Sequence, residues 1–149
     1  MLISQKCQYA LRAIFELAKR REDGPVKIAE VAEAQAIPKR FLEVILSQLK
    51  QGSFVTSQRG SEGGYTMARV PSDLSVGEII RFIQGPVGPV DCLATESSEK
   101  CPLYGACVFL PMWQDAADAI SEVYDKTTFQ DLVERDAQRQ DQYIASYTI

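Results

Sequence analysis

The sequence predicts a mainly α-helical protein with a small β-wing, in which a winged helix-turn-helix domain is followed by a long helix suited to dimerisation. Three observations predict this fold class: helical spacing of apolar residues near the N-terminus, two short β-type runs around a glycine-rich segment, and a long amphipathic pattern near the C-terminus. We expect three parts: the winged domain at 1–84, a cysteine-containing segment at 85–108, and a dimerisation helix with a C-terminal helix at 109–149.

The first predicted helix spans residues 2–20. Ala10, Ile14 and Leu17 recur at helical spacing, and the basic residues at 19–21 suit the C-terminal end of a helix. Glycine and proline at 24–25 then end it.

Two short helices joined by a tight turn are predicted next. Ile28 and Val31 share one face of a helix over 27–34, and residues 35–37 form the turn. A third helix begins at Pro38, because proline suits the first helical position. Its apolar stripe consists of Phe41, Leu42, Ile45, Leu46 and Leu49. Together these segments form a helix-turn-helix pattern.

A hairpin is predicted directly behind the third helix. The runs 54–57 and 65–68 are β-type, and residues 58–64 between them contain three glycines. A hairpin in this position is a wing, and we expect Arg59 at its tip, where glycines allow the backbone to approach another surface closely.

Residues 75–84 predict one more short helix, and residues 85–108 are expected to form a loop. A long amphipathic helix is predicted around 110–126. Its apolar side chains are Trp113, Ala116, Ala117, Ile120, Val123 and Tyr124. So long a stripe outside the core requires a partner. Thr127 and Gln130 predict the capped start of a last helix, whose polar end is expected to fray.

Charge is distributed unevenly along the chain. Residues 1–71 contain 11 Lys and Arg against 7 Asp and Glu, whereas residues 72–149 contain 5 against 13. The net charges of the two parts are therefore +4 and −8, which make up the total of −4. A basic front part can face phosphates while an acidic rear part faces solvent.

The composition excludes several classes of protein. The chain has no histidine, which removes imidazole as a general base and every Ser-His or Cys-His nucleophile, so an enzyme is not expected. No apolar run reaches the roughly 18 residues that span a bilayer, and no signal-peptide pattern opens the chain. We therefore expect a cytoplasmic protein without a membrane partner.

Cys92, Cys101 and Cys107 are the residues on which chemistry can be based. In a reducing compartment, cysteines serve as metal or redox thiolates more often than as structural disulfides. The spacing alone leaves four interpretations open: an iron-sulfur cluster, a zinc site, a thiol redox switch, or cysteines used as small hydrophobic residues. Cys7, in an apolar helix, is interpreted first as a core residue.

The second helix of a helix-turn-helix offers its N-terminal residues to the major groove of DNA. Lys39 and Arg40 can reach phosphates or a guanine edge there, and Glu43 can accept from a cytosine amino group. Arg59 is placed to enter a minor groove narrowed by A·T-rich sequence. The wing would also contribute Ser57, Gln58 and Gly60. The alternative is a solvated helix face on a domain that docks a protein partner.

These motifs, in this order, resemble the bacterial regulator family that includes IscR, NsrR and CymR. The resemblance runs nearly end to end. It rests on Tyr9, Ala10, Leu11, Arg12 and Ala13, on Phe41, Leu42, Glu43 and Leu49, on Arg59, Gly60, Gly63, Gly64 and Tyr65, and on the three cysteines with Trp113. It implies a homodimer, related through the long helix, that binds a partly palindromic double-stranded DNA operator with two recognition helices and two wings.

The resemblance also implies that Cys92, Cys101 and Cys107 ligate an iron-sulfur cluster, as in IscR-like and NsrR-like members, whereas CymR-like members lack the three cysteines. IscR-like members use a histidine as fourth ligand, where this chain has Leu110, and NsrR-like members use an aspartate from the partner's first helix, at the position of Gln8. The fourth iron position is thus open or filled by another donor. The candidates are Cys7 or Gln8 from the partner, or Asp91, Glu96 or Glu99 from the loop.

The sequence therefore predicts a transcriptional regulator, most often a repressor, whose operator affinity is controlled by a [2Fe-2S] or [4Fe-4S] cluster. One alternative is a cluster-free winged-helix regulator in which the three cysteines form a thiol redox or zinc switch. A second is a thiol oxidoreductase or cluster carrier, which the absence of a Cys-x-x-Cys pair disfavours.

Overall fold

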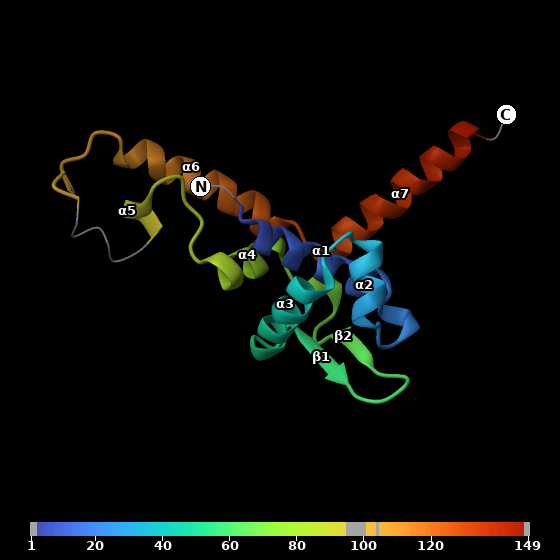
Figure 1. Ribbon diagram of the computed structural model, residues 1–149. Coiled ribbons are helices and arrows are strands. Elements are labelled where there is room, and N and C mark those ends of the chain that lie inside the picture. Colours follow the sequence, from blue (N-terminus) through green and yellow to red (C-terminus); the bar gives the residue numbers. More distant parts are fainter. Residues whose placement is uncertain (1–2, 95–100, 104, 148–149) are drawn as a thin grey trace.

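The computed structural model describes residues 3–94, 101–103 and 105–147. Helices and one two-stranded sheet form the fold, which confirms the predicted fold class (Figure 1). The α-helices are α1 (Gln5–Lys19), α2 (Ile28–Ala34), α3 (Lys39–Gln51), α4 (Val76–Gln84), α5 (Asp91–Ala94), α6 (Leu110–Lys126) and α7 (Phe129–Tyr147). The strands are β1 (Val55–Gln58) and β2 (Gly64–Met67), and Arg21–Asp23 and Pro71–Asp73 form 3-10 turns.

α1 is the central element of the core. It packs against α2, α3, α4, α7 and β2, and its inner side chains Ala10, Ala13 and Ile14 are fully buried. The small alanines allow neighbouring helices to approach it closely, and the larger side chains of those helices fill the space around it. From α3 these are Leu42, Ile45, Leu46 and Leu49, which are at most 2% exposed.

α1 begins later than predicted. The hydroxyl of Ser4 accepts a hydrogen bond from the backbone N–H of Cys7 at 3.2 Å, so Ser4 is the N-cap and Gln5 is the first helical residue. The predicted start at residue 2 was wrong, because a capping serine has extended rather than helical backbone angles.

The helix-turn-helix is held onto α1 by polar contacts. The Glu16 carboxylate, buried at 4% exposure, accepts from Arg20 Nε at 2.6 Å and from Gln35 Nε2 at 2.7 Å. The Arg12 guanidinium donates to the carbonyl oxygen of Gln35. These contacts fix the turn between α2 and α3, so the orientation of α3 depends on α1.

Two details of α3 differ from the prediction. Pro38 has a ψ of 126° and precedes the helix as its N-cap, so α3 begins at Lys39. Phe41 was predicted to face the core, but 48% of it is exposed. The buried stripe is already complete with Leu42 and the residues three, four and seven positions later, and Phe41 lies at its edge.

The wing is the antiparallel pair β1–β2, with Val55 opposite Met67 and Gln58 opposite Gly64. Both strands are shifted by one residue from the predicted runs. Phe54 is excluded because its N–H donates to the Leu49 carbonyl oxygen at 3.0 Å, which closes the end of α3.

The junction between α6 and α7 is bonded to the segment before α4. Val76 N–H donates to Thr127 O at 2.9 Å, and Phe129 N–H donates to Leu74 O at 3.1 Å. Phe129 is fully buried in the core. α7 therefore joins the winged-helix core through its N-terminal turns, where Leu132 and Val133 also pack against the core.

The cap of α7 lies one residue beyond the predicted Thr127. The Thr128 hydroxyl accepts from the Asp131 N–H at 3.1 Å, and the Asp131 carboxylate accepts from the Thr128 N–H at 2.8 Å. The Thr127 hydroxyl instead donates to the Val123 carbonyl oxygen at the end of α6. α7 is helical to Tyr147, through the polar stretch at which the sequence analysis expected fraying.

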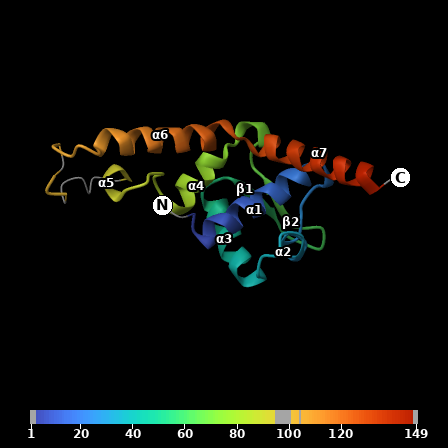
Figure 2. The ribbon, with the colours of Figure 1, turned by 90° about the horizontal axis from the view of Figure 1, so that it is seen from above.

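α6 and α7 run along one side of the molecule, and the helix-turn-helix lies on the other (Figure 2). The N-terminal end of α6 projects from the body, next to the segment that contains α5 (Figure 1). Residues 85–108 were predicted as a loop throughout, but Asp91–Ala94 form the short helix α5. Within the described residues, no helix is long and apolar enough to cross a membrane.

We predict that Glu16→Ala lowers the free energy of unfolding by about 1–3 kcal/mol, because Arg20 and Gln35 lose a buried acceptor. Glu33→Ala, at an exposed position of α2, should change it by less than about 0.5 kcal/mol. Urea unfolding of both variants measures the difference. Equal stability of the two variants would contradict the anchoring role of Glu16.

Candidate functional site

The exposed start of α3 carries the residues that the sequence predicted for DNA. Lys39, Arg40 and Glu43 are all exposed. The Arg40 guanidinium lies over the Phe41 ring, 4.9 Å from its centroid, which holds the Arg40 side chain near the helix surface. The exposed Phe41 thus has a partner on the surface.

A groove of about 550 Å³ lies between α3 and the wing. It brings together five of the predicted residues: Lys39, Glu43, Ser57, Gln58 and Arg59. Lys27, at the N-terminus of α2, also lines it and was missed by the sequence analysis. Arg40 and Gly60 are not part of its lining. Gly60 lies in the turn between the strands with a φ of 108°, which favours glycine.

Contacts of β1 and β2 with neighbouring segments fix the position of the wing relative to the helices. Val26 and Tyr65 exchange backbone hydrogen bonds of 2.9 and 2.8 Å, which attach β2 to the segment before α2. Gly64 allows this approach, because a Cβ there would clash with the Val26 carbonyl oxygen. Lys50 Nζ at the end of α3 donates to Ser57 Oγ at 2.6 Å. The wing and α3 therefore present one surface.

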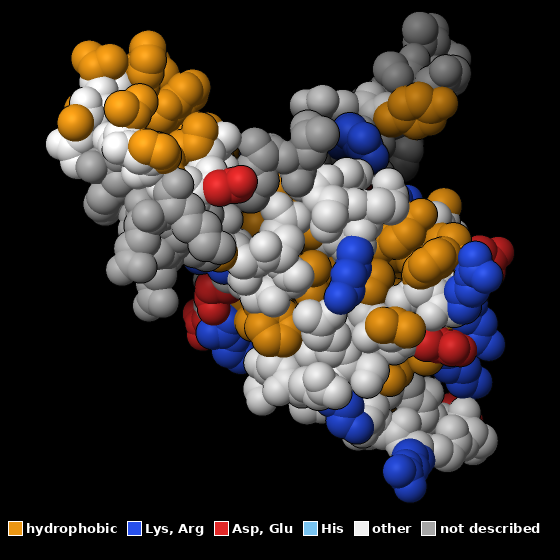
Figure 3. Space-filling view, turned by 60° about the vertical axis from the view of Figure 1, so that its left-hand side comes forward, with side chains coloured by type: hydrophobic (Ala, Val, Ile, Leu, Met, Phe, Trp, Pro, Cys, Tyr) orange, Lys and Arg blue, Asp and Glu red, His pale blue; other side chains and the backbone are white. Residues whose placement is uncertain are grey.

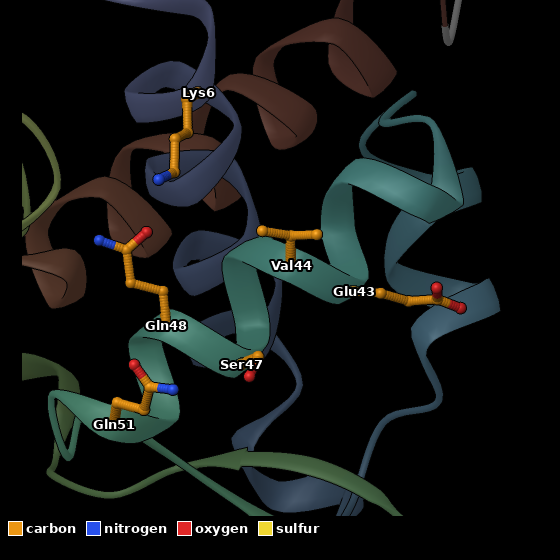
Figure 4. Close-up of a pocket in the computed structure, with 6 residues that line it drawn as sticks. All are labelled: Lys6, Glu43, Val44, Ser47, Gln48 and Gln51. Carbon is orange, nitrogen blue, oxygen red and sulfur yellow. The ribbon is translucent and has the colours of Figure 1, made fainter.

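A second groove, of about 650 Å³, lies on the other side of α3, next to the N-terminus of α1. Its lining consists of Lys6, Glu43, Val44, Ser47, Gln48 and Gln51 (Figure 4). The side chains of Lys6 and Gln48 point toward one another in Figure 4, whereas Glu43 points toward α2. Glu43 lines both grooves, so it marks the ridge between them. Lys6 and Val44 were missed by the sequence analysis, because only the fold places α1 beside the exposed face of α3.

The cations of this surface are available for a ligand. Among the residues that the structure describes, none of Lys6, Lys27, Lys39, Arg40 and Arg59 forms an ion pair. Unpaired cations on either side of an exposed helix favour a polyanionic ligand with two charged strands, as in duplex DNA.

The three cysteines of the 85–108 segment are free thiols of intermediate burial. Cys92 lies in α5, and the carbonyl oxygen of Cys107 accepts from the N–H of Leu110, the first residue of α6, at 3.2 Å. Over 3–94, 101–103 and 105–147, no three cysteine or carboxylate side chains are gathered closely enough to hold a metal ion. Glu96 and Glu99 lie outside the described residues.

The two predicted donors on α1 differ in accessibility. Cys7 is fully buried, and burial raises the pKa of its thiol, so the thiolate form is disfavoured. This supports the interpretation of Cys7 as a core residue. Gln8 is exposed, and its side-chain amide donates to the Ile3 carbonyl oxygen at 3.0 Å.

The apolar stripe of α6 is only partly covered. Ala117 is 6% exposed, and this side of α6 packs against α4. The adjoining edge and the segment before the helix remain exposed, with Leu103, Val108, Phe109, Met112, Ile120 and Val123 at 36–82%. Figure 3 shows hydrophobic side chains gathered over the projecting end of the molecule. Such a patch is typical of an interface.

Comparison with known proteins shows similarity to transcriptional regulators. The chain is 34% identical over 144 residues to the HTH-type transcriptional regulator CymR of Bacillus subtilis, with 97% of this chain and 98% of that protein covered. It is 31% identical over 133 residues to IscR of Yersinia pestis, covering 89% of this chain and 79% of that protein. The structure of T. potens IscR superposes with a TM-score of 0.78 at 30% identity, covering 94% of this chain and 91% of that one.

The relatives are regulators rather than enzymes, and the fold of the described residues is that of the regulators. The model of the Rrf2 family, described as iron-dependent transcriptional regulators, matches residues 3–135. The chain therefore belongs to the Rrf2 family of DNA-binding transcriptional regulators.

Proposed function

We propose that this protein is a transcriptional repressor that binds a partly palindromic double-stranded operator as a homodimer. An iron-sulfur cluster on Cys92, Cys101 and Cys107 controls its affinity for the operator. The observation that best supports DNA binding is the surface around α3. A groove with unpaired cations lies on each side of this exposed helix. In this proposal, residues 1–84 read DNA, 85–108 form the sensor segment, and 109–149 provide dimerisation.

We assign a role to each residue proposed to contact DNA from its position on α3, on the wing or in one of the two grooves. Lys39 and Arg40, at the start of α3, contact phosphates or a guanine edge in the major groove, and Glu43 accepts from a cytosine amino group. Arg59 of the wing enters an adjacent minor groove. Ser57 and Gln58 contact the sugar-phosphate backbone, and Gly60 shapes the turn that presents Arg59. Lys6 and Lys27 bind phosphates from the two grooves.

We predict that Lys39→Ala weakens DNA binding and reduces the magnitude of the slope of log K against log salt by about 1.8, the value of two phosphate contacts, one from each protomer of the dimer. The control is Arg135→Ala, an exposed cation on α7. It should leave the slope unchanged. Fluorescence anisotropy across salt concentrations measures both variants, with a duplex selected by the protein from a random library. An unchanged slope in Lys39→Ala would contradict its phosphate contact.

Dimerisation is supported by the exposed edge of α6. Phe109, Met112, Ile120 and Val123 lie on one side of the helix, with Ala116 between them, and no part of the described chain covers them. Antiparallel packing of this edge against its copy would bury it and place two reading surfaces on one duplex, as a partly palindromic operator requires.

We predict that Val123→Asp shifts the protein from dimer to monomer, because burying an unpaired carboxylate in an apolar interface is costly. Gln114→Glu adds the same charge on the opposite side of α6 and should leave the dimer intact. Sedimentation velocity separates the two states. A dimeric Val123→Asp variant would contradict an interface through this edge.

The three thiols of the sensor segment suit an iron-sulfur cluster chemically. They are partly exposed and outside disulfides, and thiolates are the soft donors that such clusters require. A bound cluster supplies a centre whose occupancy or redox state changes with iron and oxidants. Because the thiols are not gathered in the described structure, binding requires the segment to reorganise. Cys107 adjoins α6, so that change reaches the proposed dimer helix and then the reading surfaces.

The candidate fourth donors differ in accessibility. Gln8 of α1 is exposed and accessible to a partner's segment, and Asp91 in α5 lies next to Cys92. Cys7 is buried, and burial raises the pKa of its thiol. We propose Gln8 from the partner or Asp91 as the fourth ligand.

We predict that protein purified without oxygen is brown, contains iron and sulfide, and loses both in Cys92→Ser, Cys101→Ser and Cys107→Ser. Cys7→Ser is the control and should keep its iron, because the Cys7 thiol lies in the core of its own protomer, out of reach of a partner's segment. Visible absorbance and iron analysis measure the outcome, and the absorption spectrum distinguishes [2Fe-2S] from [4Fe-4S]. Equal operator affinity of iron-loaded and iron-free protein would contradict control by the cluster.

A cluster-free regulator is the second candidate. It is supported by the separation of the thiols among the described residues and by the similarity to CymR over nearly the whole chain. In that case Cys92, Cys101 and Cys107 form a thiol redox or zinc switch. Colourless, iron-free protein after anaerobic reconstitution would favour it over the cluster, and zinc analysis would then separate its two forms.

A further inference from the structure

We propose that Val44 reads the operator directly, by contacting the C5-methyl group of a thymine in the major groove. The proposal rests on the DNA binding proposed above and adds a sequence requirement, a thymine in each half-site at the position that Val44 faces. It assigns a specificity-determining role to Val44, an uncharged residue that contributes nothing to phosphate binding.

The first observation is the position of Val44 on α3. The buried residues of α3 are Leu42, Ile45, Leu46 and Leu49, and Val44 lies on the opposite side of the helix, with 61% of it exposed. Its neighbours one turn away on that side are Arg40, Ser47 and Gln48. Val44 is therefore an apolar residue in the middle of a polar, DNA-facing surface.

The second observation separates Val44 from the other exposed apolar residue of α3. The Phe41 ring is covered on one face by the Arg40 guanidinium, which gives it a role in positioning that cation. Val44 instead lines the groove beside α1, below Lys6 in Figure 4. A lysine and an exposed valine that line the same groove suit a phosphate strand and a base edge, respectively.

The third step is chemical. Base edges in the major groove present hydrogen-bond donors and acceptors, and the thymine methyl is the apolar group among them. Valine has no side-chain donor or acceptor, so facing another base edge would desolvate a polar group without a partner. Val44 therefore favours thymine both by contact with its methyl and by the cost of the alternatives.

The test begins with a random duplex library, from which wild-type protein and Val44→Ala each select their preferred sequences. We expect one thymine in each wild-type half-site to lose its preference in Val44→Ala, while the other positions are unchanged. Replacing the thymine of one half-site by deoxyuridine, which lacks the methyl, should weaken wild-type binding about fourfold, the effect of one buried methyl group. The same replacement should weaken Val44→Ala binding less than about 1.5-fold.

The controls separate this proposal from folding and from the proposed function. Val44 is exposed, so Val44→Ala should keep its circular dichroism spectrum and its unfolding midpoint. Val70→Ala removes the same groups from a valine outside α3, the wing and the exposed edge of α6, and should select the wild-type sequence. An unchanged thymine preference in Val44→Ala would overturn the role of Val44 and leave DNA binding intact. Failure of the wild-type protein to enrich any sequence would contradict DNA binding itself, and this proposal with it.

Discussion

The burial of α1 is the constraint on which the rest of the structure depends. Its alanine-rich inner face contacts the helix-turn-helix on one side and α4 and α7 on the others. A hydrophobic core this small has room for one central helix, so every other element is oriented by packing against it. The buried Glu16 adds direction to this packing, because its hydrogen bonds connect α1 to the turn before α3.

The surface around α3 follows from that orientation. Once the turn is fixed, the polar side of α3 lies between the wing and the first turn of α1, with a groove on each side. The cations of both grooves lack ion pairs among the described residues, whereas Arg69, Arg81 and Lys126 elsewhere are paired with carboxylates. The surface around α3 is therefore basic although the net charge of the chain is negative, because the acidic residues are concentrated after the wing.

α6 connects this surface to the sensor segment. One edge of its apolar stripe packs against α4 and the other is uncovered, so a partner bound to α6 is also held against the winged-helix core. The ion pair between Arg81 and Asp125 and the two backbone hydrogen bonds at the start of α7 make this connection stiff. Among the described residues, no backbone hydrogen bond or ion pair joins the projecting N-terminal end of α6, next to Cys107, to the core. In the proposed function, this is the end that a change in the segment moves.

The sequence by itself determined the order and type of the elements except the short α5, together with the wing, the charge division and the exposed start of α3. These features depend on residues a few positions apart, through helical spacing, turn chemistry and local charge. Helical spacing alone predicted that Phe41 is buried, but other side chains fill the core and Phe41 is exposed. Local capping signals placed the start of α7 one residue early, because the Thr127 hydroxyl bonds to the end of α6 instead. Only the tertiary structure decided that Lys6 and Val44 share a groove, that Cys7 is buried, and that one edge of α6 is left uncovered, because these facts depend on contacts between segments distant in the sequence.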